Sequence, residues 1–383
     1  MNYSGIKIAL DPSPKQQRQL NREAGAARFA YNWTIDFVSE AYENDPNYRV
    51  NFFEIRKTFN ALKPILAPWW KECSSQAFAN GIRDAVRSFS NFFSSLCGSR
   101  KGAYCGYPKY KNYNSRKSFH HTTGSFGPDP DNPYVIKIPR VGKIHTFQNV
   151  HKRFHAVSKI VNMTVCQEGK RWFACFTVEA EFFKRGKSTS NKIGVDLGIR
   201  TLATTSDGQT FENPKAYHKS EKKLRRLHKN LGRQKKYSNR RQTTKRKLQA
   251  LHCHVCNQRV DAIQKATTCL VRNNETIILE DLKIEEMKQD KLLAKAISDA
   301  AWGEFRREIV YKGMQYGRNI VFIDTFYPSS QLCSQCGSRK ADLTLQDRIY
   351  RCNQCGLIMD RDLNAAINLL KAGEIMANEN SIE

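Results

Sequence analysis

The sequence is poor in acidic residues and has no long hydrophobic run. It contains 36 Asp and Glu against 63 Lys and Arg, so its formal net charge is +27 over 383 residues. No apolar run reaches the roughly 20 residues that a membrane-spanning helix needs, and the first residues lack the basic and then apolar pattern of a signal peptide. We therefore expect a soluble cytoplasmic protein that binds a polyanion. Nucleic acid is the first candidate and an anionic membrane surface is the second.

The cysteines are numerous but unevenly spread, and only four have the spacing of a metal site. Cys333 and Cys336 form one Cys-X-X-Cys pair, Cys352 and Cys355 form a second, and a glycine follows each pair. This spacing predicts two tight turns whose four thiolates enclose one tetrahedral Zn²⁺, with redox chemistry as the alternative. Because four thiolates leave no position for a reactive water, the zinc would be structural. Residues 252–256 (His-Cys-His-Val-Cys) lie in a predicted helix without a partner pair, and we do not expect them to bind a metal.

The first half of the chain combines strand and helix patterns. A short strand is predicted at Gly5–Leu10, and apolar residues recur at steps of three and four over residues 20–38 and 78–96, which is typical of helices. Strand patterns return at residues 134–138, 159–166 and 172–178. This order predicts a small β domain with a helical insertion after its first strand. Residues 182–191 have the composition of a linker.

The second half of the chain follows an α/β order. The predicted strands lie at 193–195, 202–206, 209–211, 276–279 and 319–326, and helices lie near 302–316 and 364–370. Three consecutive strands, followed by strands that alternate with helices, are compatible with a ribonuclease-H-like sheet, in which parallel strands extend an antiparallel meander. Residues 373–383 are polar and are expected to form a disordered tail.

The segment between Lys219 and Lys247 is strongly basic, with fourteen Lys and Arg and a single acid, Glu221. Leucines at helical spacing predict a helical hairpin over residues 217–271. Like charges at close spacing are unfavourable without a counter-charge, which a phosphate backbone would supply. A solvated helix face is the alternative. The residues that we expect to contact nucleic acid here are Arg225, Arg226, Lys235 and Lys236.

Three acids lie where a carboxylate is costly unless it is paired or binds a cation. Asp196 follows the apolar strand at 193–195, Glu280 ends the strand at 276–279, and Asp362 begins the last predicted helix. Hard divalent ions such as Mg²⁺ take oxygen ligands, and two such ions can activate water and stabilise the leaving oxygen of a phosphodiester. The alternative is that Asp196 is a turn residue, Glu280 a surface acid and Asp362 a helix N-cap.

Six motifs run in order along nearly the whole chain. They are Arg28–Trp33, Gly106–Tyr110, Leu279–Leu282, Ala296–Phe305, Tyr327–Cys333 and Asp360–Ala366. Together they resemble the TnpB family of transposon-encoded RNA-guided DNA endonucleases, which are related to the type V CRISPR effectors. The resemblance implies a guide RNA from the transposon end, a double-stranded target DNA that is cut beside a short adjacent motif, and no membrane partner. Such a protein would be cytoplasmic and would associate with the nucleoid when bound to DNA.

The resemblance also implies a multidomain α+β architecture. A wedge β-barrel with a helical recognition insertion would precede a ribonuclease-H-like (RuvC) α/β nuclease domain with an inserted zinc ribbon that has four cysteine ligands. The expected ranges are 1–12 and 99–182 for the wedge, 13–98 for the recognition helices, 183–331 and 358–372 for the nuclease, 332–357 for the ribbon, and 373–383 for the tail. The family's catalytic triad falls on Asp196, Glu280 and Asp362, which would hold two Mg²⁺, while the four cysteines would hold one structural Zn²⁺. Asp362 is preferred to Asp360 because it directly precedes the motif residues Leu363–Ala366.

Three rival functions stay open at this point. An RNA-guided DNA-binding repressor without cleavage is the main alternative, although the presence of all three acids argues against it. A zinc-ribbon transcription or RNA-processing factor would leave the three acids unexplained. A DNA-joining transposase is the third, but no Tyr or Ser nucleophile context argues for it.

We expect the first half of the chain to read the motif beside the target. The predicted helix Ser75–Leu96 turns its apolar stripe inward, which leaves other faces for polar residues. Gln76 and Asn80 could pair with base edges, and Arg83 and Arg87 could contact phosphates. A solvated helix face is the alternative for each of them, and the basic-aromatic segment at residues 107–117 is the alternative reader.

Overall fold

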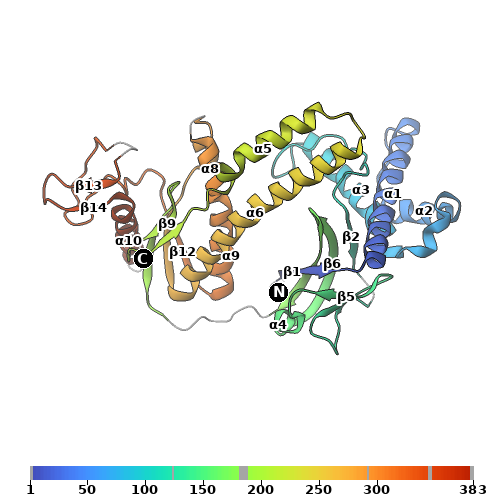
Figure 1. Ribbon diagram of the computed structural model, residues 1–383, viewed down its shortest axis with the longest axis horizontal. Helices are drawn as coiled ribbons and strands as arrows, with labels where there is room; N and C mark the ends of the chain where they lie inside the picture. Colours follow the sequence, from blue (N-terminus) through green and yellow to red (C-terminus); the bar gives the residue numbers. More distant parts are fainter. Residues whose placement is uncertain (1–2, 123–124, 181–188, 291–292, 344–346, 380–383) are drawn as a thin grey trace. The chain divides into compact units, whose positions relative to one another are not determined.

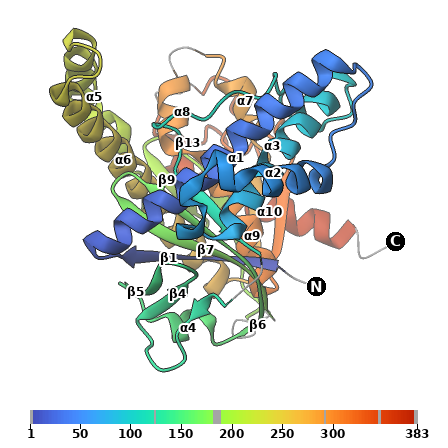
Figure 2. The same cartoon turned by 90° about the vertical axis from the view of Figure 1, so that its right-hand side faces the viewer.

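The computed structural model describes residues 3–122, 125–180, 189–290, 293–343 and 347–379. The chain divides into two compact units, Met1–Glu181 and Phe182–Glu383, and the ribbon views in Figures 1 and 2 show the elements of each. Most of the predicted linker at 182–191 lies outside the described residues. In the described part of the chain, no helix has both the length and the apolar character needed to cross a membrane.

The first unit consists of a seven-stranded antiparallel sheet and a group of helices inserted after its first strand. Figure 2 shows α1, α2 and α3 gathered beside one another. In chain order the elements are β1 (Tyr3–Asp11), α1 (Pro14–Asn44), α2 (Phe52–Leu66), the 3₁₀ helix η1 (Pro68–Glu72), α3 (Ser75–Leu96), β2 (Ser118–His121), β3 (Gly127–Pro128), β4 (Val135–Ile138), β5 (Gly142–Thr146), α4 (Val150–Phe154), β6 (Val157–Glu168) and β7 (Arg171–Ala180).

The sheet of the first unit is open, so the predicted β-barrel is wrong. Its strand order is β2-β6-β7-β1-β5-β4-β3, which leaves β2 and β3 at its two ends. The short strand β3 consists of Gly127 and Pro128, and a proline has no backbone N–H to donate to a further strand. In β1, the alternation of exposed residues with buried Ile6, Ile8 and Leu10 shows that one face of the sheet carries the core.

Helices α1 and α3 pack closely because small residues lie between them. A Cβ atom placed on Gly81 of α3 would lie 2.3 Å from the carbonyl oxygen of Ala27 in α1. The apolar stripe of α3 is buried as its spacing predicts, with Phe78, Ile82 and Phe89 each no more than 2% exposed. This packing fixes α1 against α3, while Phe29 on another face of α1 contacts Phe59 of α2 and Trp69 of η1.

The second unit consists of a five-stranded sheet with helices on both faces, a long helical hairpin and a small two-stranded ribbon. In chain order the elements are β8 (Lys192–Asp196), β9 (Thr201–Thr205), β10 (Thr210–Glu212), α5 (Ala216–Arg233), α6 (Asn239–Asn273), β11 (Thr276–Glu280), α7 (Ile284–Met287), α8 (Ala294–Ala300), α9 (Trp302–Tyr316), β12 (Asn319–Ile323), β13 (Ile349–Arg351), β14 (Ile358–Asp360) and α10 (Arg361–Glu379).

The order of the five-stranded sheet is β10-β9-β8-β11-β12. Strands β8, β9 and β10 form an antiparallel meander, and β11 and β12 extend it in parallel to β8. One face of the sheet packs against α6 and α9 through a large apolar core that includes Val195, Leu279 and Phe305. The other face packs against α10 through Ile278 and Leu369. The mixed α+β architecture and the meander with parallel additions are therefore both present.

The last helix is longer than the sequence pattern predicts. Helix α10 runs from Arg361 to Glu379, whereas a helix was expected near residues 364–370 and a disordered tail from residue 373. Residues 373–379 are helical, and residues 380–383 lie outside the described residues. The helix continues because Ala372 is buried against the sheet beside Leu369.

Candidate catalytic acids, cysteine cluster and nucleic-acid contacts

Asp196 and Glu280 end two neighbouring parallel strands. Val195 of β8 lies opposite Leu279 of β11 in the parallel register, so the two acids that follow them leave the sheet at the same edge. Side chains alternate between the two faces of a strand. Val195 and Leu279 point into the core under α6 and α9. Their neighbours Asp196 and Glu280 therefore belong to the opposite face, which α10 covers.

Asp362 reaches this edge because α10 approaches β8 very closely. A Cβ atom on Gly194 would lie 2.0 Å from the carbonyl oxygen of Ala366, so a side chain at position 194 would push α10 away. Asp362 lies one helical turn before Ala366 and hence on the same face of α10. Its Oδ2 atom lies 3.9 Å from the position that a Cβ atom on Gly198 would take, in the loop that follows Asp196. The structure thus brings the three predicted acids to one region of the sheet.

The environment of the three acids disfavours their charged forms. Burial, together with the charges of Asp362 and Glu280, raises the pKa of Asp196 to about 8. Burial alone raises the pKa of Glu280 to about 7, and burial and the charge of Asp360 raise the pKa of Asp362. Within the described ranges, none of the three forms an ion pair with Lys or Arg. The charges of nearby arginines, Arg361 for Asp196 and Arg348, Arg361 and Arg200 for Asp362, only partly offset these shifts. Partly buried carboxylates of this kind are suited to a hard divalent cation with oxygen ligands, such as Mg²⁺.

Asp360 and Asp362 have different roles at the start of α10. The exposed Asp360 accepts hydrogen bonds through Oδ1 from the backbone N–H groups of Asp362 at 2.9 Å and Leu363 at 3.2 Å. This arrangement is that of a helix N-cap. The N-cap interpretation therefore applies to Asp360, and the partly buried side chain of Asp362 is left for the acid cluster.

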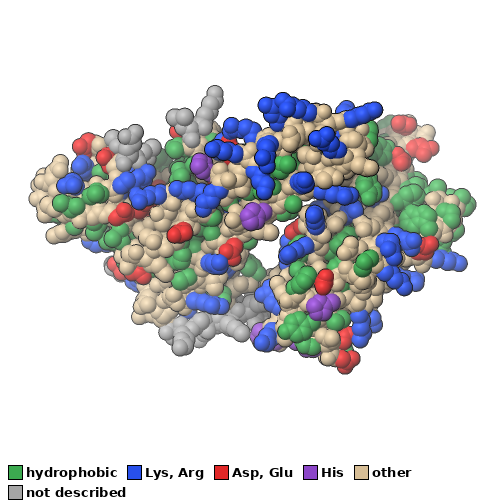
Figure 3. Space-filling model, viewed as in Figure 1, with side chains coloured by type: hydrophobic (Ala, Val, Ile, Leu, Met, Phe, Trp, Pro, Cys, Tyr) green, Lys and Arg blue, Asp and Glu red, His purple; other side chains and the backbone are tan. Residues whose placement is uncertain are grey.

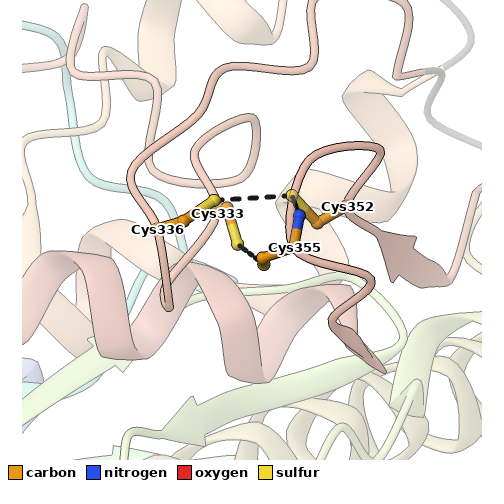
Figure 4. A group of neighbouring side chains, drawn as sticks. All are labelled: Cys333, Cys336, Cys352 and Cys355. Carbon is orange, nitrogen blue, oxygen red and sulfur yellow. Dashed lines mark hydrogen bonds between the residues drawn. The ribbon is translucent and has the colours of Figure 1, made fainter.

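The four predicted zinc ligands come together in the ribbon that precedes α10. Figure 4 shows the cysteines of the two loops facing one another. The Sγ atoms of Cys333 and Cys355 are 3.5 Å apart, and those of Cys336 and Cys352 are 3.6 Å apart. All four Sγ atoms lie within 4.8 Å of one another, and they are the one such group of ligand atoms found among the described residues. The three acids are therefore less tightly gathered than the cysteines.

Local backbone geometry forms each half of the cysteine cluster. The N–H groups of Gly337 and Gly356 donate to the carbonyl oxygens of Cys333 and Cys352, at 2.9 and 3.2 Å, and each glycine has a φ of +75° that favours this residue type. Backbone N–H groups, first that of Cys355, and the Ser338 hydroxyl lower the pKa of the Cys352 thiol to about 5. A thiolate is the form that binds zinc, so the cluster fits one tetrahedral Zn²⁺.

The basic helical hairpin presents its cations to solvent. The space-filling view in Figure 3 shows Lys and Arg side chains gathered over α5 and α6. Of the residues expected to contact nucleic acid, Arg225 forms a 2.9 Å ion pair with Glu221 and is still 77% exposed. Arg226, Lys235 and Lys236 are also exposed.

A buried acid that the sequence pattern did not single out holds this hairpin in place. Asp299 of α8 is 5% exposed and accepts hydrogen bonds from the backbone N–H groups of Tyr217 and His218, at 2.9 and 3.0 Å. It also accepts a 2.9 Å hydrogen bond from Nε of Arg259 in α6. Asp299 therefore ties the start of α5 to α6 and α8. Its position inside the Ala296–Phe305 motif was the one signal in the sequence.

The residues proposed to read the DNA motif have different environments. The expectation that Asn80 is exposed is wrong, because it is 4% exposed and its Nδ2 donates to the carbonyl oxygen of His120 at 3.0 Å. Gln76 is partly exposed, and its Oε1 accepts a 3.1 Å hydrogen bond from the Thr122 hydroxyl. Arg83 and Arg87 are exposed. The helix pattern missed the packing of α3 against β2, which buries Asn80.

Three protein-family models match the chain. One described as "Probable transposase" matches residues 173–291, one described as "Cas12f1-like, TNB domain" matches residues 302–369, and one described as "Helix-turn-helix domain" matches residues 1–46. In this chain, residues 1–46 contain strand β1 and the single helix α1. The match over residues 173–291 runs from within β7 to beyond α7, and the match over residues 302–369 runs from the start of α9 into α10.

Relatives match along almost the whole chain. A protein of Streptomyces pristinaespiralis named "Putative RNA-guided DNA endonuclease" is 31% identical over 371 residues, which cover 96% of this chain and 89% of that protein. The "Putative RNA-guided DNA endonuclease InsQ" of Escherichia coli (strain K12) is 30% identical over 385 residues, covering 96% and 92%. TnpB-like protein L79 of Acanthamoeba polyphaga mimivirus is 24% identical and covers 97% of this chain and 73% of that protein.

A solved structure shares the fold. The Cas12f1 chain in a cryo-EM structure of a Cas12f1–sgRNA–target DNA complex aligns with a TM-score of 0.50 at 16% identity, covering 93% of this chain and 82% of that chain. At this identity the likeness concerns the fold alone. It agrees with a mixed α+β architecture of several parts.

Proposed function

The chain belongs to the TnpB family, and on this premise we propose that it is an RNA-guided DNA endonuclease. The observation that carries the proposal is the meeting of Asp196, Glu280 and Asp362 at one edge of the second unit's sheet. Metal-assisted hydrolysis of a phosphodiester uses such acids to hold the ions, whereas guided binding alone does not need them. The chain would cut double-stranded DNA beside a short adjacent motif.

We assign the five-stranded sheet and its helices to a ribonuclease-H-like (RuvC) nuclease domain. The antiparallel meander with parallel additions supports this assignment. The two-stranded ribbon at residues 332–357 would be a zinc-binding insertion that ends where α10 begins. In the first unit, the helices at residues 13–98 would form the recognition insertion.

The three acids would hold two Mg²⁺, which supply an activated water and stabilise the leaving oxygen of the phosphodiester when bound. The chain's own part is to keep three carboxylates at one sheet edge, where no Lys or Arg of the described residues forms an ion pair with them. Their raised pKa values reflect burial and mutual repulsion, which a bound cation would relieve. The chain would have one catalytic site for the DNA. Each strand of the target would therefore have to reach this site in turn, unpaired from its partner strand.

The other partners follow from charge and placement. The exposed cations of the α5–α6 hairpin would bind the backbone of a guide RNA from the transposon end, or of its heteroduplex with the target, by shape rather than by sequence. The adjacent DNA motif would be read by the first unit, where Gln76 remains partly exposed and Asn80 does not. The four cysteines would hold one structural Zn²⁺.

The test begins with the RNA that copurifies with the protein. Sequencing this RNA identifies the guide, and a plasmid library then carries the matching target beside randomised flanks. With Mg²⁺, the wild-type complex should linearise those plasmids that share one flanking motif, whereas a library with a mismatched target should stay intact. If matched plasmids are bound but never cut, the guided repressor is the correct function.

A further inference from the structure

The helices of the first unit enclose a groove that the proposed function has not used. It has a volume of about 780 Å³ and lies between α1 on one side and the end of α2 with η1 on the other. Arg28 and Trp33 line it from α1, and Leu66 and Trp69 line it from the opposite side. Trp69 packs against Phe29 and Phe78, and it is still 38% exposed.

The basic-aromatic segment at residues 107–117 is fixed along the edge of this groove. The side chain of Asn32, which also lines the groove, donates through Nδ2 to the carbonyl oxygen of Lys111 and accepts through Oδ1 from its N–H, each at 2.9 Å. This pair of hydrogen bonds holds the segment against α1. The Tyr110 hydroxyl adds a further hydrogen bond to Asp36 of α1.

Tyr113 of this segment presents an exposed ring beside cations. The ring is 72% exposed, and the guanidinium of Arg28 lies 5.7 Å from its centroid, while Nζ of Lys117 lies 5.3 Å from it. Arg28 therefore links the exposed ring of Tyr113 to the groove. An aromatic face with flanking cations is the combination that binds the bases and phosphates of unpaired nucleic acid.

The acids of the groove are already engaged. Glu72 forms a 2.7 Å ion pair with Arg22, and Asp36 accepts the hydrogen bond from Tyr110. By contrast, Arg28 has no carboxylate partner among the residues that the structure describes. The hydrogen bond from the neutral Tyr110 hydroxyl leaves Asp36 charged, so the positive charge that a phosphate would contact comes from Arg28 together with Lys117, on the two cation contacts of the Tyr113 ring.

We propose that this groove binds unpaired nucleotides, with bases stacked on Trp69 and Tyr113 and phosphates at Arg28. The inference rests on the proposed RNA-guided function for the source of these nucleotides, which would be the RNA or the opened DNA. It goes beyond that function by assigning a path for a single strand to the helices of the first unit. Stacking on aromatic rings needs no particular base, so the groove takes nucleotides of any sequence.

Gly25 offers a way to fill the groove without disturbing the fold. It lies in α1 and lines the groove, and a Cβ atom placed on it meets no atom within 4 Å. Leucine at this position would project into the open volume, whereas alanine would add one methyl group and leave most of the groove empty. Both changes remove a glycine from a helix interior, which favours the helix. Thermal unfolding of the two variants should therefore occur at or above the wild-type temperature.

The experiment maps photocrosslinks in the complete complex of protein, RNA and target DNA, made with the Asp196→Ala protein. One arm carries 4-thiouridine in the RNA, and the other carries 5-iododeoxyuridine in the DNA. Crosslinks from unpaired positions to Trp69 or Tyr113 are expected in at least one arm, and the arm identifies the strand. The absence of such crosslinks in both arms would overturn the proposal.

The variants then test the groove itself. Gly25→Leu should lower the crosslink yield about tenfold, which corresponds to the loss of one stacked base, and Gly25→Ala should stay near wild type. As a matched aromatic control, Tyr134→Ala removes a tyrosine that is 45% exposed elsewhere in the same unit and should change nothing. An unchanged yield in folded Gly25→Leu protein would contradict the proposal.

The same crosslinks separate this inference from its rivals. An acidic peptide is the other occupant that Arg28 would attract, so oligouridine should suppress the crosslinks more strongly than polyglutamate does, and the reverse order would overturn the proposal. If the crosslinks form but the wild-type protein cuts no guided target, the groove is supported and the endonuclease is rejected. Guided cutting without any crosslink in the groove would reject the groove alone.

Discussion

The four cysteines and the three acids are both candidate sets of metal ligands in the second unit, but they are assembled in different ways. The cysteine Sγ atoms already lie within 4.8 Å of one another, whereas the acids are less tightly gathered and have raised pKa values. Each half of the cysteine cluster is a single turn of backbone that is fixed by its own hydrogen bonds. The acids come from the ends of two strands and the start of a helix, so only the packed sheet brings them together.

This difference matters for what each site can do. A structural zinc needs all four ligands close together, and it contributes folding energy to a segment with a small core of its own. A catalytic ion needs positions that remain open to substrate. Acids that are held apart by packing, and that form no ion pair with Lys or Arg in the part of the chain that the structure describes, leave such positions open. The two sites should therefore respond differently to loss of one ligand.

The largest expected effect is on cleavage by the Asp196→Ala protein. Loss of a residue that only hydrogen-bonds to a metal ligand typically costs roughly 10–100-fold in metal affinity or activity. Loss of a proposed ligand itself should therefore reduce cleavage by more than about 100-fold. Guided binding to target DNA should change little, because phosphate contacts dominate that affinity. Plasmid cleavage and gel-shift assays measure the two effects. Cleavage near the wild-type rate would show that Asp196 is not in the catalytic site.

The second effect is on the ribbon, where loss of one ligand should act through folding. Metal analysis of the wild-type protein should find about one Zn²⁺ per chain, and Cys336→Ser should lower this content and expose residues 332–357 to limited proteolysis. Cys256→Ser is the matched control, because Cys256 is an exposed free cysteine on α6. If Cys336→Ser keeps its zinc and residues 332–357 stay resistant to proteolysis, Cys336 is not a zinc ligand.

The cysteine cluster and the acids also differ in how far they could be predicted from sequence. Two Cys-X-X-Cys pairs with following glycines describe local turns, so their meeting could be predicted. The strand ends at Asp196 and Glu280 were also visible as apolar runs that stop at an acid. The close approach of α10 to β8 that positions Asp362 could not be predicted in this way. Gly194 and Ala366 are far apart in the chain, and only their packing shows why a glycine is needed at position 194.

Predictions failed where a second element changed an otherwise regular pattern. Asn80 lies off the apolar stripe of α3, but β2 packs over it and its amide pairs with His120. The sheet of the first unit stays open, with β2 at one end and the two-residue strand β3 at the other. The groove beside α1 could not be predicted. Trp69 lines it and the segment at 107–117 is hydrogen-bonded to Asn32 at its edge, and the sequence pattern does not place either of them against α1.

The third effect tests the packing that brings the acids together. Gly194→Ala places a Cβ atom 2.0 Å from the carbonyl oxygen of Ala366, so α10 must move. Overpacking of this kind costs about 1–3 kcal/mol in stability, and the shift of Asp362 should lower cleavage as well. Gly303→Ala is the matched control, since its nearest neighbour would be 3.8 Å away. Urea unfolding measures the cost, and equal stability of the two variants would contradict this account of Gly194.

The smallest effect concerns a buried acid that has hydrogen-bond donors and no proposed metal. Glu23 of α1 is 0% exposed and accepts hydrogen bonds from the backbone N–H of Ser74, at 3.0 and 3.1 Å, yet burial raises its pKa to about 7. Because the folded state holds this proton more tightly than the unfolded state, stability is present at low pH and is lost as the pH rises through about 7. Between pH 6 and pH 8 the loss should be about 1 kcal/mol. Asp196, Glu280 and Asp362 act in the same direction, so the measurement is made in a background that carries Asp196→Asn, Glu280→Gln and Asp362→Asn. Urea unfolding of that protein should show the slope, and adding Glu23→Gln should flatten it. Mg²⁺ should leave the Glu23 contribution unchanged. A slope that survives Glu23→Gln would assign the dependence to another group.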